Sequence, residues 1–170
     1  MHGSDGNRAR WAAAEYGDRL HNDLRHGAIA GLLGGVSIIL LFSAYDALFF
    51  GPLTTPDRLS QSLLSIEDVA AGIGVRLSFV VRIGLFTVFH LGSFAVLGTV
   101  LANLFRMSGV RSRLLLGGLY GLTACTVVFF AGLNLSGTQL LAAPEWPALL
   151  LGNFVAGVVM GGYLQVRASL

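Results

Sequence analysis

The residues of this sequence that could do chemistry are a few polar side chains placed inside long apolar segments. His90 lies in one such segment, where an imidazole can relay a proton, ligate the metal of a tetrapyrrole or form a hydrogen bond. Counting ~1.5 Å per residue along helices that alternate in direction places Asn153, Ser43 and Thr126 near the depth of His90. We therefore treat these four residues as a candidate polar cluster.

Two interpretations of this cluster stay open at the level of sequence. In the first, His90 and Asn153 form hydrogen bonds that hold neighbouring helices together. In the second, His90 is the single axial ligand of a chlorophyll-type pigment, and Gly92 leaves room beside the ring. Haem held by two histidines is disfavoured, because the other histidines all lie within the first 26 residues. We expect no cofactor and keep a pigment at His90 as the alternative.

A second candidate is an ion pair near the end of two consecutive apolar segments. Asp46 lies close to the end of the first segment, and Arg82 lies at the start of the second. Because consecutive helices run antiparallel, the two side chains should share a depth at the hydrocarbon edge. We predict an Asp46–Arg82 salt bridge with a structural role.

Catalytic and metal-binding motifs are missing from the sequence. It has no Gly-x-Ser-x-Gly or His-Glu-x-x-His motif and no phosphate-binding loop. A single cysteine, Cys125, excludes an internal disulfide and a cysteine-rich metal site. A net charge of +2 is too small to indicate nucleic-acid binding. We expect a protein that is not an enzyme and binds neither a metal nor nucleic acid.

The elements that must position these residues are four long apolar segments. Each reaches roughly the 20 residues that a helix needs to cross a ~30 Å hydrocarbon layer. Charged residues make up only 12% of the chain, against about 25% in soluble domains. The expected spans are residues 27–50, 83–105, 114–135 and 147–166. The sequence therefore predicts an all-α polytopic membrane protein, a four-transmembrane-helix bundle in contact with the lipid bilayer.

Two further helices are expected outside the spans. Residues 1–26 form a charged leader, predicted to be an amphipathic helix on the cytoplasmic surface, and residues 27–170 form the transmembrane domain. Residues 56–66 are predicted to be a short helix on the outer surface. Its start is indicated by Thr55 as N-cap, Pro56 at the first helical position and Asp57 in the first turn.

The distribution of arginine predicts the orientation of the spans. The leader, the short loop after the second span and the C-terminal tail together hold eight arginines: Arg8, Arg10, Arg19, Arg25, Arg106, Arg111, Arg113 and Arg167. The other side holds three, Arg58, Arg76 and Arg82. This bias predicts cytoplasmic N- and C-termini.

Small residues recur along one face of each span. In lipid, such faces allow two helix backbones to approach closely. The glycines that we expect to pack helices together are Gly27, Gly31 and Gly35 in the first span, Gly98 in the second, Gly117 and Gly121 in the third, and Gly157 and Gly161 in the fourth.

Four segments carry a resemblance to other proteins: AGLLGG at 30–35, YDALFFGPLTTP at 45–56, VFHLGSFAVLG at 88–98 and LLLGNFVAGVVMGGYL at 149–164. With them the chain resembles a loose group of small four-span bacterial membrane proteins of unassigned function. The resemblance covers about residues 27–166. It implies a four-helix bundle in a bacterial cytoplasmic membrane and no particular activity, and the charged leader lies outside its pattern.

Two functional hypotheses follow from these observations. The first is a non-catalytic accessory or structural subunit of a larger membrane complex, of respiratory or photosynthetic type, with other membrane subunits as partners. The second is a binder of a small molecule or tetrapyrrole, or a minor transporter, that uses the polar cluster around His90. The sequence favours the first, because it combines small size and glycine-lined faces with no catalytic motif.

Overall fold

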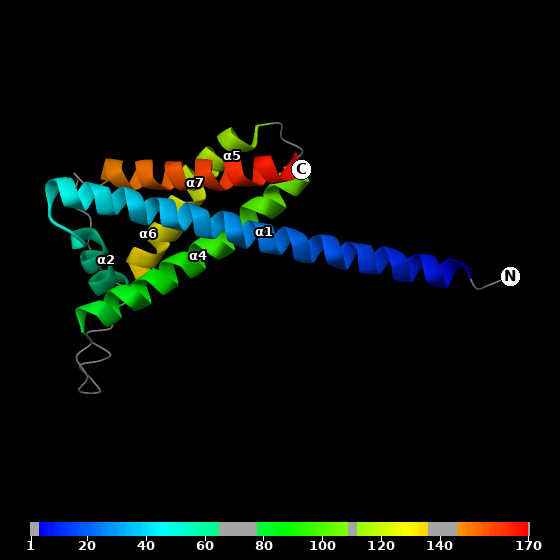
Figure 1. Ribbon diagram of the computed structural model, residues 1–170, viewed down its shortest axis with the longest axis horizontal. Coiled ribbons are helices and arrows are strands. Elements are labelled where there is room, and N and C mark those ends of the chain that lie inside the picture. The colour runs from blue at the N-terminus through cyan, green and yellow to red at the C-terminus, as the bar shows by residue number, and fades with distance from the viewer. Residues whose placement is uncertain (1–3, 65–77, 109–111, 136–145, 170) are drawn as a thin grey trace.

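The computed structural model describes residues 4–64, 78–108, 112–135 and 146–169, and every regular element in these ranges is a helix. The helices are α1 (Ser4–Phe49), α2 (Thr54–Leu64), α4 (Phe79–Ser108), α5 (Arg113–Tyr120), the π-helical turn η1 (Gly121–Cys125), α6 (Thr126–Leu135) and α7 (Trp146–Ala168) (Figure 1). α5, η1 and α6 follow one another without a gap and together form the third long helical segment.

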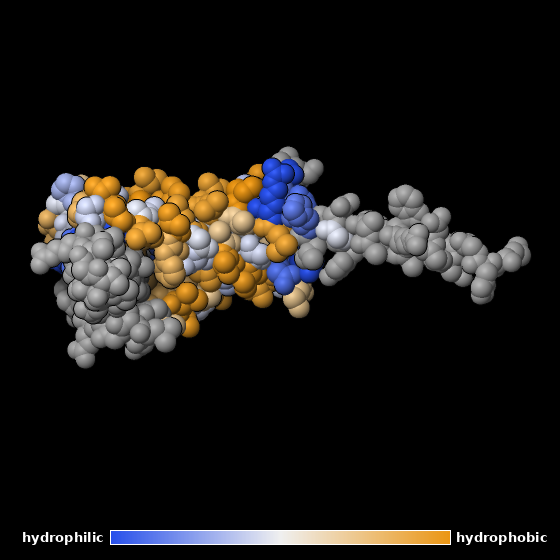
Figure 2. All heavy atoms as spheres, turned by 90° about the horizontal axis from the view of Figure 1, so that it is seen from below, coloured by the Kyte–Doolittle hydropathy of each residue, from blue (hydrophilic) through white to orange (hydrophobic). Residues whose placement is uncertain are grey.

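Four of these segments are long and apolar enough to cross a membrane. Their bounds are His21–Phe49, Phe79–Ser108, Arg113–Ala131 and Pro147–Ala168. Apolar side chains cover the outside of the bundle over most of its length, as the orange surface in Figure 2 shows. The predicted all-α architecture with four spans is confirmed, and the protein is an integral membrane protein.

α1 is the central element of the bundle. It packs along α4 on one side and along α7 on another, and α7 in turn packs along α5 and η1. α4 makes few contacts with α5 or α7, and α6 diverges from α7 toward α2. The spans therefore form a row in the order α4, α1, α7 and the continuous segment of α5, η1 and α6. Space remains between α4, at one end of this row, and α6, at the other.

Glycines allow α1 to approach α4 closely. A Cβ on Gly27 would lie 2.6 Å from the Cα of Thr99, and a Cβ on Gly98 would lie 2.6 Å from the Cα of Gly31. At Gly35 the nearest atoms belong to the side chains of Leu91 and Phe94 on α4. No larger residue fits between the two backbones at Gly27 and Gly98, which explains why these positions are glycine.

A second glycine contact joins α5 and η1 to α7. Cβ atoms on Gly121 and Gly157 would each lie 2.8 Å from the Cα of the other, and a Cβ on Gly117 would lie 2.9 Å from the Cα of Gly161. The structure thus places all eight of the glycines expected from the sequence at helix contacts. A further glycine, Gly34, faces the side chain of Met160 on α7, although it falls outside the four-residue spacing of Gly27, Gly31 and Gly35.

The leader and the first span form one helix. α1 runs without a break through residue 26, where we expected a boundary, and Figure 1 shows it continuing beyond the ends of the other helices toward the N-terminus. At its other end α1 stops where Gly51 adopts a φ of +105°, followed by Pro52 and then by Leu53 with a φ of +64°.

α2 is tucked against the bundle. It begins at Thr54, two residues before the start expected, and packs on α4, α1 and α6. Ser60 on its inner face is 1% exposed, whereas Arg58 and Gln61 are exposed. α2 therefore forms one end of the bundle, which we call the α2 end. The expected last residues of this helix, 65 and 66, lie outside the described ranges.

The close packing of α1 on α4 makes a specific prediction. Gly31→Ala should lower the free energy of unfolding by about 1–3 kcal/mol, because overpacking forces the two backbones apart. The added Cβ would meet the Phe94 carbonyl and lie 2.8 Å from the Cα of Ala95. Thermal unfolding followed by circular dichroism in a mild detergent measures this effect.

Gly92→Ala on α4 is the matched control, because no atom lies within 4 Å of a Cβ at that position. It should be neutral or stabilise the helix by up to about 1 kcal/mol, since alanine favours helix over glycine. Equal unfolding midpoints for the two variants would contradict the close approach of α1 and α4.

Candidate functional site

A cavity of about 360 Å³ lies where the row of spans leaves space between α4 and α6. α1 and α7 contribute further lining residues, and α2 lines the cavity from its own end of the bundle. The divergence of α6 follows directly after η1, a turn of i→i+5 hydrogen bonds that changes the face presented by the residues after it. The volume lies within the ~300–1,000 Å³ range of small-molecule sites.

The lining of this cavity is mostly apolar. Its apolar residues are Ile38, Ile39 and Phe42 on α1, Pro56 and Leu59 on α2, Phe86, Phe89, Phe94 and Leu97 on α4, Cys125 at the end of η1, Val128, Phe129 and Ala131 on α6, and Leu149 on α7. Polar side chains from three elements join them: Thr55, His90, Ser93 and Asn153. A largely apolar space with a few polar groups is suited to a lipid-soluble ligand that carries a hydrogen-bonding group.

His90 lines this cavity from α4 and carries a buried ring nitrogen that no described residue satisfies. Its ring lies between those of Phe86 and Phe94, at centroid distances of 5.7 and 4.8 Å, which α-helical spacing places one turn below and above it. The backbone of Gly35 on α1 lies within interaction range of the ring. The Nε2 atom is buried and has no hydrogen-bond partner among the described residues. An unsatisfied buried polar atom costs about 1–3 kcal/mol, so a ligand that meets it gains affinity.

Asn153 and Thr126 form the second polar element beside the cavity. The Asn153 Nδ2 donates to the Thr126 Oγ1 at 3.0 Å and so links α7 to the first residue of α6. Asn153 is 3% exposed and lines the cavity. This bond links the third and fourth spans just after they begin to diverge.

The structure thus gathers part of the expected polar cluster. His90 and Asn153 line one cavity, and Thr126 is bonded to Asn153. Ser43 does not line the cavity, although it lies on α1 near the expected depth. Ser93, which sequence reasoning missed, lies one helical turn from His90 on the same face of α4. The three-residue spacing of His90 and Ser93 was the available signal.

At the α2 end, the buried carboxylate of Asp46 caps α2. The Thr55 backbone N–H donates to Asp46 Oδ2 at 2.7 Å, and the Thr55 hydroxyl donates to Asp46 Oδ1 at 2.5 Å. Asp46 is fully buried. The Thr55 N–H lies in the first turn of α2, where backbone donors have no partner within the helix and an anion is favoured. The side chain that caps the start of α2 is therefore that of Asp46 on α1, and not that of Thr55 as we expected.

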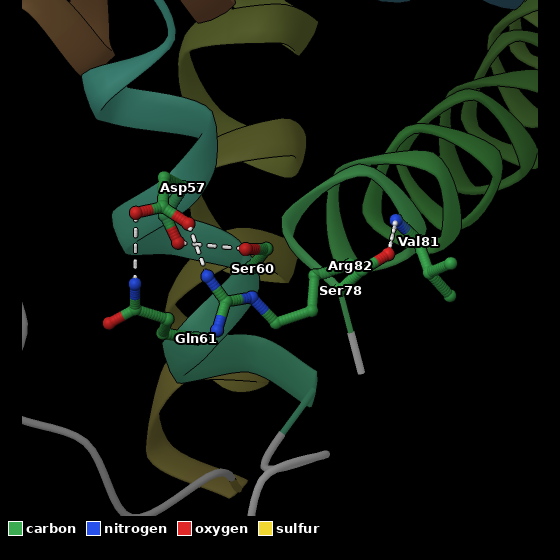
Figure 3. A network of polar contacts seen from close by, with 6 residues as sticks. All are labelled: Asp57, Ser60, Gln61, Ser78, Val81 and Arg82. Carbon is green, nitrogen blue, oxygen red and sulfur yellow. Dashed lines mark hydrogen bonds and ion pairs between the residues drawn. The ribbon is translucent and has the colours of Figure 1, made fainter. Parts of the chain in front are cut away.

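The predicted Asp46–Arg82 ion pair is wrong. Arg82 Nη2 donates instead to Asp57 Oδ1 on α2 at 2.8 Å (Figure 3). Asp57 also accepts a hydrogen bond from Gln61 Nε2 at 3.0 Å, and its carbonyl accepts one from the Ser60 hydroxyl at 2.7 Å. The two charges do lie toward the same end of the bundle. However, α2 folds in beside them and offers each a closer partner.

Among the described residues, no group of three or more His, Cys, Asp or Glu side chains comes together in a way that could hold a metal ion. Comparison of the chain with protein-family models, curated proteins and solved structures finds no match. The resemblance to small four-span membrane proteins thus stays a prediction, and the case for a function depends on the site itself.

The capping role of Asp46 is open to a direct test. Asp46→Ala should lower the free energy of unfolding by about 1.5–3 kcal/mol, the usual value of hydrogen bonds to a charged group. Denaturant titration in detergent micelles, followed by circular dichroism, measures it. Gln61→Ala on the exposed face of α2 is the control and should stay within about 0.5 kcal/mol of the parent. An Asp46→Ala variant as stable as the Gln61→Ala variant would contradict the capping role.

Proposed function

We propose that this chain is a non-catalytic membrane protein that binds a lipid-soluble small molecule in the cavity between α4 and α6. The observation that carries the proposal is the buried His90 Nε2, which lacks a partner beside a largely apolar cavity. A hydroxyl group on the ligand would pair with this nitrogen in either tautomer of the neutral imidazole, because a hydroxyl can both donate and accept a hydrogen bond. The apolar remainder of the ligand would fill the space lined by aliphatic and phenyl groups.

The position of the cavity supports a ligand that arrives through the membrane. Most of the lining side chains belong to membrane-spanning helices, and the exposed Phe89 on α4 and Val128 on α6 are among them. A lipid-soluble molecule would reach the cavity between these helices without crossing a charged surface. The buried Asn153 would supply a second polar contact for a ligand with two polar groups.

A matched pair of probes tests this proposal. A phenol with a decyl tail should bind the purified protein at least about tenfold more tightly than decylbenzene, the effect of one satisfied polar atom. His90→Phe should abolish this preference while keeping the aromatic stack with Phe86 and Phe94. Displacement of a fluorescent apolar probe from detergent-solubilised protein measures both affinities.

Ser43→Ala is the control, because Ser43 lies on α1 outside the cavity lining, and it should keep the preference for the phenol. Equal affinity for the two probes, or an unchanged preference in His90→Phe, would contradict the proposal. An absorbance spectrum of protein isolated from its native membrane tests the pigment alternative. Visible bands that disappear in His90→Phe would identify a tetrapyrrole ligand, and a colourless protein would contradict it.

We infer a second role, as an accessory subunit, from the N-terminal part of α1. From Ser4 to the start of the first span this helix is about 25 Å long at ~1.5 Å per residue, and it continues past the other helices in Figure 1. A helix of this length is marginal in water without tertiary packing, which favours a partner that packs on it. The arginine bias supports a cytoplasmic position for this segment in a bacterial inner membrane, with both termini on that side.

Deletion of residues 1–20 tests the accessory role. The truncated chain should keep the unfolding midpoint of the bundle, because the deletion leaves the glycine contacts of α1 with α4 intact. It should lose any partner subunits that native mass spectrometry detects with the full chain extracted in gentle detergent. A full chain that is monomeric under these conditions, or a truncated chain that keeps its partners, would contradict this role.

A further inference from the structure

The end of the bundle opposite α2 carries a group of basic side chains around a second, more open cavity of about 430 Å³. We call this the basic end. Arg106 at the end of α4, Arg113 at the start of α5 and Arg167 at the end of α7 all line it. Asp23 on α1 is the acidic residue among the described lining residues, so the charged side chains around the cavity carry an excess of positive charge. Figure 2 shows hydrophilic residues gathered where the apolar surface of the bundle ends.

Hydrogen bonds to neighbouring helices hold two of these arginines in position. Arg113 Nη1 donates to the Leu164 carbonyl on α7 at 2.7 Å, and its guanidinium lies 5.6 Å from the centre of the Phe105 ring. Arg167 Nε donates to His26 Nε2 on α1 at 3.1 Å. Because arginine only donates, the His26 Nε2 atom accepts this bond and the ring is neutral. The His26 Nδ1 atom therefore carries the proton and donates to the Tyr163 hydroxyl at 3.0 Å.

Arg106 is held by exposed side chains, and its hydrogen bond stays within its own helix: Arg106 Nη2 donates to Asn103 Oδ1 on α4 at 2.9 Å. Its contact with Asp23 spans 3.6 Å between side chains that are 42% and 44% exposed, and such exposed pairs contribute little. A second anion that approached Arg106 would therefore compete with a weak partner. The guanidinium groups of arginine suit phosphate in particular, because their N–H donors match its oxygens in pairs.

One wall of the same cavity, on the side toward the middle of the spans, is apolar. Ala102, Phe105 and Leu164 line it beside the arginines, and exposed Leu104 and Leu114 lie close by in the sequence on α4 and α5. The cavity thus joins a cationic rim to an apolar wall at the place where the spans end. An amphiphile with an anionic head and apolar tails has the same division of chemistry at this depth.

We propose that the basic end binds the phosphate group of an anionic phospholipid of the surrounding leaflet. Arg106 and Arg167 receive the phosphate, Arg113 holds α5 to α7 beneath it, and the acyl chains run along the apolar wall toward the spans. Neutral His26 orients Arg167 through its Nε2 atom. This site is separate from the cavity at His90, which lies toward the α2 end of the same helices.

The test compares phospholipids that differ only in their head groups. Native mass spectrometry of the full chain in a non-ionic detergent would count bound phosphatidylglycerol and phosphatidylcholine of identical acyl chains. Phosphatidylglycerol should bind at least about tenfold more tightly, the effect of two arginines beside an anionic head group. The preference should fall as the salt concentration rises, because the site is open to solvent. Equal binding of the two lipids would overturn the proposal.

Two variants distinguish this site from a general attraction of a basic protein. The double variant Arg106→Gln, Arg167→Gln should lose the preference for phosphatidylglycerol, whereas Arg58→Gln at the α2 end should keep it. Arg113 is left unchanged because it holds α5 to α7. A double variant that keeps the preference would overturn the proposal. Should the double variant fail to fold, the lipid preference of the parent chain and its salt dependence decide the outcome.

Inorganic phosphate separates a lipid site from a site for a soluble anion. At equal concentration, phosphate alone should neither raise the unfolding midpoint nor displace bound phosphatidylglycerol, because it lacks the acyl chains that meet the apolar wall. Stabilisation by phosphate that depends on Arg106 and Arg167 and matches that of the lipid would assign the basic end to a soluble anion and overturn the lipid proposal.

Discussion

Helices in lipid gain nothing from removing apolar side chains from water, so their arrangement depends on close backbone contact at small residues. Here the contact is made twice, by Gly27, Gly31 and Gly98 between α1 and α4, and by glycines of α5, η1 and α7. α1 joins the two pairs through its packing on α7. This pairing orders the spans in a row and leaves α4 and α6 apart. The cavity beside His90 exists because no corresponding contact holds those two helices together.

The two ends of the bundle use their polar residues differently. At the α2 end, Asp46 and Arg82 each bond to α2, and the polar groups are largely satisfied within the protein. The short helix α2 thereby covers this end of the bundle and completes the wall of the cavity beside His90. At the basic end, arginines border an open cavity with a single acidic neighbour among the described lining residues. The first arrangement stabilises the fold, and the second leaves positive charge around an open cavity at the end of the spans.

Much of the architecture could be predicted from the sequence, because membrane spans are set by local composition. An apolar run of sufficient length must form a helix in lipid, whatever its neighbours, and the four expected spans overlap those of the structure. Glycine spacing likewise located the faces at which helices meet, since close approach requires residues without side chains. The continuous helix through residue 26 was not expected, because the polar leader differs in composition from the span although both favour helix.

The composition of the candidate site could not be predicted from the depth of each residue along its helix. Counting residues placed His90, Asn153, Thr126 and Ser43 at one level, but helix rotation and order decide which side chains face the same space. Ser43 therefore lies outside the cavity, and Ser93 lies within it. The same reasoning matched Asp46 with Arg82 by depth and failed because α2 folds in beside them and offers nearer partners. By itself the sequence determined the number, length and packing faces of the spans. Only the tertiary structure decided which polar groups meet, because a side chain bonds to its nearest partner in space.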